Sequence, residues 1–385
     1  MTTLRRTFAV YAITRHGVES ARRIVTALPD ADLFVSEKLR QRAPEGARTF
    51  PLPMGPLLEE TFPRYDAHVF VISVGAVVRM IAPLLRSKKT DPAVVCVDDA
   101  GRFSICVLSG HVGRGNAFAE RVARAIDALP VVTTASDALG TLTVDILARD
   151  LGWSLDDPDR NVTSACAAVV NEAPVLFVQE TGEPSWWPLD RALPKGVAYA
   201  TSLDGVDLSA WEMLLIASHR DLTRSHPASL ARSVVYRPKS LVLGIGCDRG
   251  TPLALIERGI VATFAAQGLS EKCVRSLATI DKKADEPALL ELSRARGWPL
   301  QAFKAEALDA LGGDCGVVSP SERVKSFVGT RGVSEPAALL ASGARGLLVA
   351  KQKYTEAGAG RSMTLAVAEI PFPKRTVRAP EGATP

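Results

Sequence analysis

The stretch LSGHVGRGNAF, residues 108–118, places one histidine among three glycines where an apolar strand gives way to a helical segment. Because glycine tolerates positive φ, Gly110, Gly113 and Gly115 predict a tight loop whose amide groups face outward. Asn116 is the expected N-cap of the next helix, and bare amides at a helix start favour a carboxylate or a phosphate. The same glycines suit a turn that binds nothing, so the spacing alone leaves both interpretations open.

His111 lies in this loop, after the C-terminal end of the strand. A lone histidine is more often structural than catalytic, but open α/β sheets bind ligands at the C-terminal ends of their strands. An imidazole with a pKa near ~6.5 can act as a general base or a general acid. His16 follows the first apolar run and is a candidate for the same rim. The other histidines give weaker signals; they are His68, His219 and His226.

The stretch VVTTASDALG, residues 131–140, forms a second strand end with Thr134, Ser136 and Asp137. Ser136 or Asp137 suits a helix cap. Alternatively, Asp137 orients His111 or binds a substrate, because neighbouring strands of one sheet bring their C-terminal ends together. No GxSxG elbow precedes the serine of the glycine loop, so a Ser–His–Asp triad is not indicated.

Cationic residues follow a further strand end in GAVVRMIAPLLRSKK, residues 75–89, which includes Arg79 and Lys88. One interpretation is a solvated basic face. The other is a binding surface for a ligand that carries several carboxylates.

The last third of the chain contains GIGCDRGTP, residues 244–252, again a strand followed by a glycine turn. Thr251 and Pro252 predict a helix start, with the threonine as N-cap. Cys247 either packs or contacts a ligand; a reactive thiol is the alternative. Further polar residues follow the later strands; they are Asp281, Lys282, Lys283, Thr330, Arg331 and Glu335.

Short apolar runs alternate with helical patterns along the chain, as in the spacing of Val18, Ala21 and Ile24. This alternation predicts an α/β, multi-domain protein with mainly parallel sheets and helices on both faces. We expect three-layer αβα N- and C-terminal domains and a smaller, less regular middle domain. The expected segments are an N-terminal domain at 8–137, a middle domain at 138–238, a C-terminal domain at 239–372 and a disordered tail at 373–385.

Two local patterns add detail to this division. Residues 181–196, TGEPSWWPLDRALPKG, predict a long surface excursion because proline is frequent. Residues 346–354 and 362–370 predict a β-hairpin.

Composition narrows the class of protein. The 385 residues are 47% hydrophobic and 23% charged, with a formal net charge of +4, which is ordinary for a soluble globular chain. The basic residues form no long runs and only 6% of residues are aromatic, so nucleic acid is not an expected partner. No segment approaches ~18 apolar residues, so no membrane span is expected. The six cysteines are scattered without a CxxC pair, which fits the cytoplasm rather than a disulfide framework or structural zinc.

The run GAVVRMIAPLLRSKKTDPAVVCVDDAGRFSICVLSGHVGRGNAFA, followed by VVTTASD, resembles the N-terminal domain of the CbiG family, the cobalt-precorrin-5A hydrolases of cobalamin biosynthesis. LVLGIGCDRGTP, VGTRGVSEPAALLAS and LLVAKQKY resemble the C-terminal domain of that family, which also occurs alone as a tetrapyrrole-associated protein. The resemblance covers most of residues 8–370 and is weakest in the middle. The family usually reads GHLGGAN where residues 110–116 read GHVGRGN, so Arg114 and Gly115 depart from its pattern.

The resemblance implies a hydrolase that opens the ring-A δ-lactone of cobalt-precorrin-5A and releases a two-carbon unit as acetaldehyde, giving cobalt-precorrin-5B in the anaerobic route to vitamin B12. Such a site needs a base for water, donors for an oxyanion, and cations for the carboxylates of the macrocycle. His111 and Asp137 are the expected catalytic residues. The expected substrate-binding residues are Arg79, Lys88, Ser109, Gly110, Gly113, Arg114, Gly115, Asn116 and Thr134, together with Gly246, Cys247, Lys283 and Lys353 across a domain cleft.

The resemblance also bears on cofactors and partners. Cobalt enters with the substrate, so we expect no cofactor and no metal site of the protein's own. A homodimer and contacts with neighbouring cobalamin-pathway enzymes stay open.

Two other functions stay open. A non-catalytic carrier of a tetrapyrrole or corrinoid fits a C-terminal domain that occurs alone, although the full N-terminal part favours the enzyme. A nucleotide-binding enzyme is disfavoured, because the GxxGxG spacing is not the dinucleotide pattern and no acidic residue is placed for a ribose.

Overall fold

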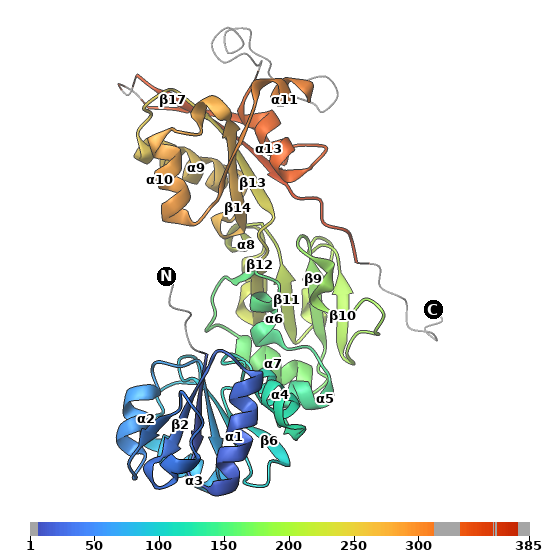
Figure 1. The fold of residues 1–385 in the computed structure, drawn as a ribbon. Helices are drawn as coiled ribbons and strands as arrows, with labels where there is room; N and C mark the ends of the chain where they lie inside the picture. Colours follow the sequence, from blue (N-terminus) through green and yellow to red (C-terminus); the bar gives the residue numbers. More distant parts are fainter. Residues whose placement is uncertain (1–6, 312–331, 357, 359, 376–385) are drawn as a thin grey trace. The chain divides into compact units, whose positions relative to one another are not determined.

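The structure is a computed structural model that describes residues 7–311, 332–356, 358 and 360–375 (Figure 1). It divides into two compact units, residues 1–146 and 147–385. The first unit contains a seven-stranded sheet and the second contains two five-stranded sheets. Helices accompany these sheets, so the predicted α/β class with mainly parallel sheets is confirmed. In the part of the chain that the structure describes, no helix combines the length and apolarity that crossing a membrane would require.

The sheet of the first unit has the strand order β3-β2-β1-β4-β5-β6-β7. Its strands are β1 (Phe8–Ala12), β2 (Ala31–Ser36), β3 (Arg48–Phe50), β4 (Ala67–Val71), β5 (Ala93–Val97), β6 (Phe103–Leu108) and β7 (Leu129–Val131). Every residue of β1, β4 and β5 is buried. Such continuous apolar runs are typical of strands that are covered on both faces.

Helices cover both faces of this sheet. On one face α1 (Arg15–Ala27) and α4 (Gly115–Ile126) pack together, and on the other lie α2 (Gly55–Thr61) and α3 (Val74–Ile81). Figure 1 shows α1 and α2 on opposite sides of β2. The predicted spacing is confirmed in α1, where Val18, Ala21 and Ile24 are buried. Burial of each large aliphatic side chain contributes about 1.5–3 kcal/mol.

One reversal of strand direction decides which loops of the first unit meet. Neighbouring strands are parallel except β5 and β6, which are antiparallel. The C-terminal ends of β6 and β7 therefore share an edge with the N-terminal ends of the other strands. The Ser109 hydroxyl, after β6, accordingly donates to the carbonyl of Asp91, before β5, over 3.0 Å. His16 follows β1 and lies at the opposite edge, so the structure separates it from the rim of His111.

The middle sheet has the order β10-β9-β11-β12-β8 and is parallel except at β8. Its strands are β8 (Ser154–Leu155), β9 (Val175–Gln179), β10 (Val197–Ala200), β11 (Met213–Ala217) and β12 (Ser233–Arg237), and α7 (Val162–Val170) packs on β11 and β12. The expected surface excursion at 181–196 is wrong for its centre. Trp186 and Trp187 are buried, and Trp186 stacks on Phe177 with ring centroids 3.8 Å apart.

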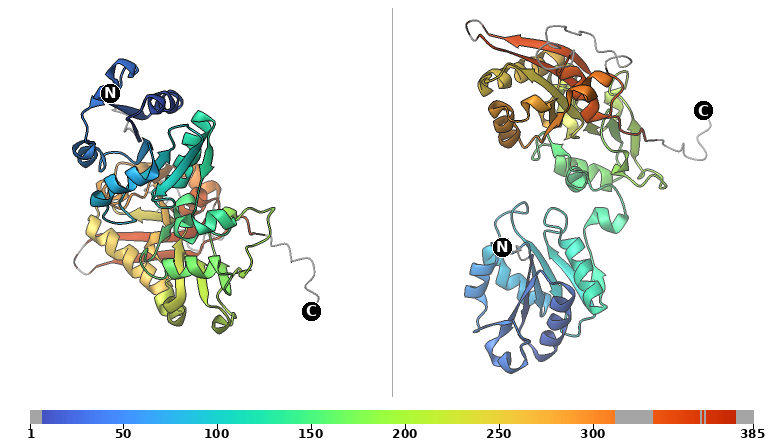
Figure 2. Two further views of the ribbon diagram at one scale, coloured as in Figure 1. Left: turned by 90° about the horizontal axis from the view of Figure 1, so that it is seen from below. Right: turned by 45° about the horizontal axis from the view of Figure 1, so that its top comes forward.

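The third sheet has the order β15-β14-β13-β17-β16. Its strands are β13 (Leu241–Cys247), β14 (Val274–Ile280), β15 (Leu300–Phe303), β16 (Val349–Thr355) and β17 (Ser362–Glu369). The predicted hairpin is confirmed, because β16 and β17 pair antiparallel, as the orange-red ribbons of Figure 2 show. On one face lie α9 (Leu253–Gln267) and α10 (Pro287–Arg296), and on the other α11 (Ala305–Ala310) and α13 (Ser334–Ser342). The αβα arrangement therefore recurs here.

The chain after β17 returns to the middle sheet. The Arg375 guanidinium is buried over the ring of Trp186, 4.8 Å from its centroid. It donates to the carbonyls of Pro184, Trp187 and Pro188 over 2.5–3.0 Å. Ordered packing thus extends past the predicted start of the tail at 373, and residues 376–385 of that tail lie outside the described chain. The predicted rim residues Thr330 and Arg331 also lie outside it.

Candidate active site

The glycine loop joins β6 to α4 and owes its shape to close packing. Its positive φ angles occur at Ser109 (56°) and Arg114 (63°), not at the three glycines for which we expected them. A Cβ atom at Gly115 would lie 2.7 Å from the carbonyl oxygen of Leu108, and one at Gly110 would lie 2.7 Å from the side-chain oxygen of Asn116. The glycines are therefore needed for space rather than for left-handed backbone.

The amides at the start of α4 are engaged within the loop, contrary to the expectation of a bare helix start. Arg114, Gly115 and Asn116 donate their backbone N–H groups to the carbonyls of His111, Ser109 and Gly110 over 2.9–3.1 Å. Nor is Asn116 the N-cap, which is Arg114 without a side-chain hydrogen bond. These three amides are therefore not available as donors to an oxyanion.

His111 lies between two carboxylates. Its Nε2 atom is 2.8 Å from Oδ2 of Asp137, on α5 (Ala135–Leu139), and its Nδ1 atom is 3.1 Å from Oδ2 of Asp145, on α6 (Val144–Asp150). The Ser136 hydroxyl is 3.1 Å from Nε2. Of the His111 side chain 14% is exposed, against 36% for Asp137 and 21% for Asp145. Asp137 therefore presents the more accessible carboxylate of the pair.

Asn116 holds Asp137 in place from the first turn of α4. Its Nδ2 atom donates to Oδ2 of Asp137 over 2.5 Å and to the Thr134 hydroxyl over 2.6 Å. Because Asn116 and His111 both contact the same oxygen of Asp137, the other carboxylate oxygen, Oδ1, is the one left for a substrate or a water molecule.

The two carboxylates favour the protonated form of His111. Its pKa is raised, chiefly by the hydrogen bond with Asp145; burial acts in the opposite direction, and Asp137 adds to the increase. Burial and the charge of Asp137 also raise the pKa of the nearby Cys106 thiol, to about 11. For a thiol, a raised pKa favours the neutral form. The carboxylates therefore favour the imidazolium form of His111, and the Cys106 thiol is neutral near neutral pH.

The expected cationic residues of the first unit lie at opposite ends of the strands of its sheet. Lys88 is exposed in the segment before β5, at the edge of His111. Arg114 is exposed beside the loop, over the ring of Phe118. Arg79 instead donates to the carbonyl of Gly75 over 3.0 Å, in the first turn of α3 and after the C-terminal end of β4. The structure does not bring Arg79 to the loop.

The expected residues of the second unit meet at one edge of the third sheet. Gly246 pairs with Thr364, which in turn pairs with the exposed Lys353. Lys283 follows β14 at the same edge, but its ammonium group contacts the fully buried Glu286 carboxylate at 3.1 Å. Lys283 is therefore paired with a carboxylate, whereas Lys353 is the exposed one of the two lysines.

The residues around this edge have mainly structural contacts. Burial raises the pKa of Cys247 to about 11, which disfavours a reactive thiolate. Glu335 accepts from the amide of Lys351 over 3.0 Å and is buried. Thr251 donates its hydroxyl to the carbonyl of Asp248, and Pro252 is the cap of α9, one residue later than predicted. Within residues 7–311, 332–356, 358 and 360–375 no group of three or more His, Cys, Asp or Glu side chains is arranged to hold a metal ion.

Three family models match the chain: the cobalamin synthesis G N-terminal region at residues 56–137, the cobalamin biosynthesis central region at 142–238, and the cobalamin synthesis G C-terminus at 241–368. A cobalt-precorrin-5A hydrolase from Priestia megaterium is 40% identical over 372 residues, which cover 96% of each chain. The chain belongs to the cobalamin synthesis G family. The family named from the sequence is thereby confirmed.

Two further relatives of the family help to define its parts. A cobalt-precorrin-5A hydrolase from Salmonella typhimurium is 31% identical over 87% of this chain and 91% of its own. Protein CobE from a Sinorhizobium species is 36% identical over 116 residues, which are 29% of this chain and 71% of its own. Relatives of this family therefore include both full-length hydrolases and a much shorter protein.

Two side chains at the glycine loop of this family member were not predicted as part of the site. Ser136 was interpreted as a helix cap, and Asp145 was assigned to the middle domain without a role. The available signal for Asp145 was weak: a carboxylate in the first turn of a short apolar helix, eight positions after Asp137. Nothing in that spacing indicates that the helix returns to the loop.

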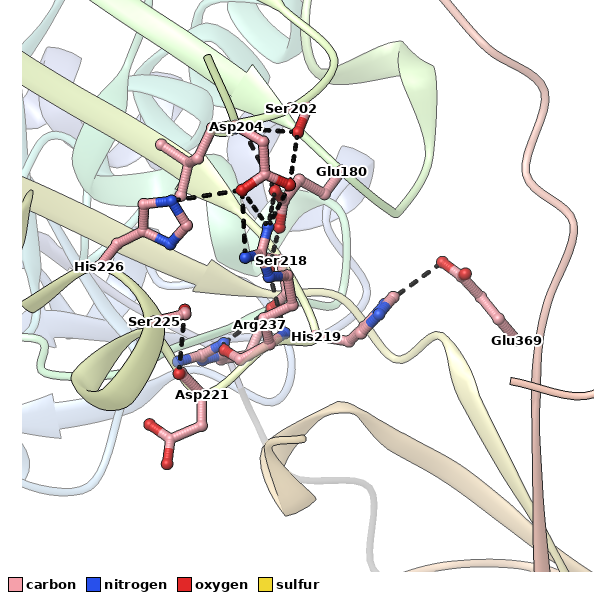
Figure 3. A network of polar contacts seen from close by, with 12 residues as sticks. Glu180, Ser202, Asp204, Ser218, His219, Asp221, Ser225, His226, Arg237 and Glu369 are labelled. Carbon is pink, nitrogen blue, oxygen red and sulfur yellow. Dashed lines mark hydrogen bonds and ion pairs between the residues drawn. The ribbon is translucent and has the colours of Figure 1, made fainter. Parts of the chain in front are cut away.

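A second polar network lies in the second unit, at the C-terminal ends of the middle strands (Figure 3). Arg220 donates to Glu180 over 2.9 Å and to Asp204 over 3.2 Å. His226 approaches Asp204 at 3.4 Å, and His219 approaches Glu369, at the end of β17, at 3.3 Å. This network links the middle and third sheets through charged side chains.

A cavity of about 640 Å³ lies beside this network, lined by residues of both sheets that include Thr181, Tyr199, Glu369 and Arg375. Its lining carries the carboxylates of Glu180 and Glu369, and the Arg375 guanidinium already serves three carbonyls. A ligand with many carboxylates would find few cations there. The His111 loop is therefore the better candidate for the chemistry of this family.

Proposed function

We propose that this chain hydrolyses cobalt-precorrin-5A, the activity for which its relatives from P. megaterium and S. typhimurium are named. The likeness to the first of these extends over nearly the whole of both chains, which supports transfer of the full activity rather than of one domain. The observation that carries the proposal is the His111 ring held against Asp137 at the rim of the first sheet.

The site suits the opening of a lactone by water. In this mechanism the water oxygen attacks the lactone carbonyl carbon, and the carboxylate of Asp137 takes a proton from the water. The bond between that carbon and the ring oxygen then breaks, and the ring oxygen takes a proton from Nε2 of His111. One water is consumed, and a carboxylic acid and a hydroxyl group form. Acid–base assistance of this kind contributes about 10²–10⁴-fold.

These roles choose between the two that the sequence leaves open for His111, general base and general acid. Because the two carboxylates raise its pKa, the ring is protonated over a wider pH range, so it is available as a proton donor rather than as a base. Asp137 has a second oxygen outside the contacts with His111 and Asn116, and that oxygen is the better acceptor. The cycle closes when Asp137 loses the proton from Oδ1 to solvent and Nε2 of His111, which lies 2.8 Å from Oδ2, takes one up.

Release of the two-carbon unit follows ring opening in the proposal. The new hydroxyl group loses its proton, and its carbon–oxygen bond becomes the carbonyl group of acetaldehyde. The carbon–carbon bond to the macrocycle breaks, and its electron pair stays with the macrocycle. Cobalt belongs to the substrate in this scheme, so the protein supplies no cofactor.

Cations near the loop bind the carboxylates on the rim of the macrocycle in this proposal. Lys88 and Arg114 are exposed at the edge of His111 and serve the first unit. Arginine and lysine both form charge-assisted hydrogen bonds with carboxylates, and arginine can do so with two parallel bonds.

We place the enzyme in the cytoplasm because its scattered cysteines suit a reducing compartment. A homodimer stays part of the proposal.

The test is anaerobic incubation of the purified protein with cobalt-precorrin-5A, followed by an acetaldehyde assay. We expect release by the wild type and a loss of about 10²–10⁴-fold in His111→Ala. His16→Ala is the matched control, because this histidine is exposed at the opposite edge of the same sheet, and its activity should equal that of the wild type. Equal release by His111→Ala would remove His111 from the mechanism. A wild type that binds the corrinoid without releasing acetaldehyde would establish the carrier instead.

A further inference from the structure

Asp145 contacts His111 on the side of the ring that faces away from Asp137. Its Oδ2 atom is 3.1 Å from Nδ1, and its Oδ1 atom is buried without a hydrogen-bond partner in the described chain. A buried carboxylate without a balancing charge is costly. The ring of His111 is therefore the natural counter-charge of Asp145.

The number of protons on the ring follows from this arrangement. A neutral imidazole has one N–H donor and one lone pair, whereas an imidazolium has two N–H donors. Each ring nitrogen of His111 lies at hydrogen-bond distance from a carboxylate oxygen. Only the imidazolium can donate to both, because a neutral ring would turn a lone pair toward one of the two carboxylates.

We propose that Asp145 is a positioning residue, which fixes the His111 ring through Nδ1 and keeps Nε2 protonated as the proton donor of the site. This inference rests on the hydrolase activity proposed above. Asp145 does not touch the reacting atoms in this arrangement, because the ring separates it from Asp137. Its effect on the reaction passes entirely through His111.

The titratable groups around the ring come from three elements and from the glycine loop. Asp137 on α5 and Asp145 on α6 face its two nitrogens, and Cys106 on β6 lies near Asp137 as a neutral thiol. Asn116 on α4 is uncharged and contacts Asp137. Arg114, in the same loop, lies over the ring of Phe118. The raised pKa of His111 has the Asp145 hydrogen bond as its largest cause, in agreement with the geometry.

The first experiment compares the pH profiles of acetaldehyde release by wild type and Asp145→Asn. Activity that needs protonated His111 falls as the pH rises through the His111 pKa, so loss of the Asp145 charge should move this alkaline limb to lower pH. We expect kcat of Asp145→Asn to fall more at pH 8 than at pH 6, because the variant loses the protonated form of His111 at a lower pH than the wild type does. KM should stay within about twofold, because the substrate does not contact Asp145.

Two control variants separate positioning from general damage. Asp150→Asn removes an exposed carboxylate from the same helix, where its partner is Arg149, and should leave the pH profile unchanged. Asp145→Glu keeps the charge and should restore the alkaline limb at least in part. An unchanged limb in Asp145→Asn, or an acidic limb that moves instead, would overturn the proposal; the second result would mean that His111 acts as a base.

The second experiment does not depend on turnover. NMR titration of the ring nitrogens, with the His111 signals assigned through His111→Gln, measures the His111 pKa directly. We expect a lower value in Asp145→Asn than in the wild type, and the same value in Asp150→Asn. If the wild type fails to release acetaldehyde but the His111 pKa falls in Asp145→Asn, the hydrolase proposal fails and the positioning role stands. An unchanged His111 pKa in Asp145→Asn would overturn the positioning role whether or not the enzyme is active.

Discussion

The histidine cluster of the first unit and the histidine network of the second use the same side chains in different ways. His111 has a carboxylate on each ring nitrogen, and no arginine or lysine takes part in these contacts. In the second unit each of two histidines approaches a carboxylate through one nitrogen (Figure 3). Arg220 binds both Glu180 and Asp204. The charge balance of the first cluster therefore depends on a proton, and that of the second depends mainly on arginine.

This difference indicates that the first cluster suits acid–base catalysis and that the second has a structural role. Arginine stays charged at all ordinary pH values and cannot move a proton. Arg220 binds two carboxylates of the middle region, Glu180 and Asp204, and the charge of this arginine hardly changes near neutral pH. A cluster balanced by His111 changes its charge with one proton, which is the property that acid–base catalysis requires.

The largest expected contrast in stability concerns arginine. Arg220→Met leaves the Glu180 carboxylate, whose side chain is 9% exposed, without its cation. We expect the free energy of unfolding to fall by about 2–4 kcal/mol, because an uncompensated buried charge is costly. Arg114→Met is the matched control in the glycine loop, where the guanidinium is exposed, and should change stability by less than about 0.5 kcal/mol. Urea denaturation measures both, and equal losses would erase the contrast between the two regions.

The next effect concerns the glycine loop. In Gly115→Ala the new Cβ would lie 2.7 Å from the carbonyl oxygen of Leu108 and 2.9 Å from the sulfur of Cys106. We expect a loss of about 1–3 kcal/mol from overpacking, together with a loss of acetaldehyde release as the loop shifts.

The matched control is Gly55→Ala at the start of α2, where no atom lies within 4 Å of the added Cβ. This variant should equal the wild type or exceed its stability by up to about 1 kcal/mol, because alanine favours the helix. Thermal unfolding of both variants tests the reason given for the glycines. A stable and fully active Gly115→Ala protein would show that close packing does not determine the loop.

The smallest expected effect is on the pH dependence of stability, which should have opposite signs for His111 and Glu369. The folded pKa of His111 is raised, so its contribution is fully present below the unfolded value of about 6.5 and is lost as the pH rises through the folded pKa. For Glu369, burial would raise the pKa, but His219 and Thr181 outweigh it and lower the pKa. Its contribution is therefore present above the unfolded value of about 4.3 and is lost as the pH falls.

Melting temperatures of wild type, His111→Gln and Glu369→Gln across the pH range measure these contributions. The gap between wild type and His111→Gln should narrow toward alkaline pH, and the gap between wild type and Glu369→Gln should narrow toward acidic pH. If the two gaps changed in the same direction, the opposite directions assigned to the pKa shifts of His111 and Glu369 would be wrong.

Local patterns in the sequence were sufficient for the elements and for much of the glycine loop. Runs such as β4 and the spacing of buried residues in α1 depend on neighbours within a few positions, and these neighbours are visible in the sequence. The proximity of His111 and Asp137 also followed, because both residues come after strands that turned out to be parallel neighbours. The role of Trp186 did not follow, since prolines in its segment indicated a surface loop although the ring stacks on Phe177.

The sequence by itself determined the family, the α/β class and the two strand ends that carry His111 and Asp137. The tertiary structure alone decided which other residues reach them. The antiparallel pairing of β5 with β6 sends Arg79 and His16 to the far edge of the sheet, and the return of α6 brings Asp145 to a histidine 34 positions earlier. The physical reason is that the direction of a strand, and the path that brings a helix back to an earlier loop, depend on how whole elements pack. The charge of His111 depends on both carboxylates at once, so its chemistry could be assigned only after the chain had been folded around it.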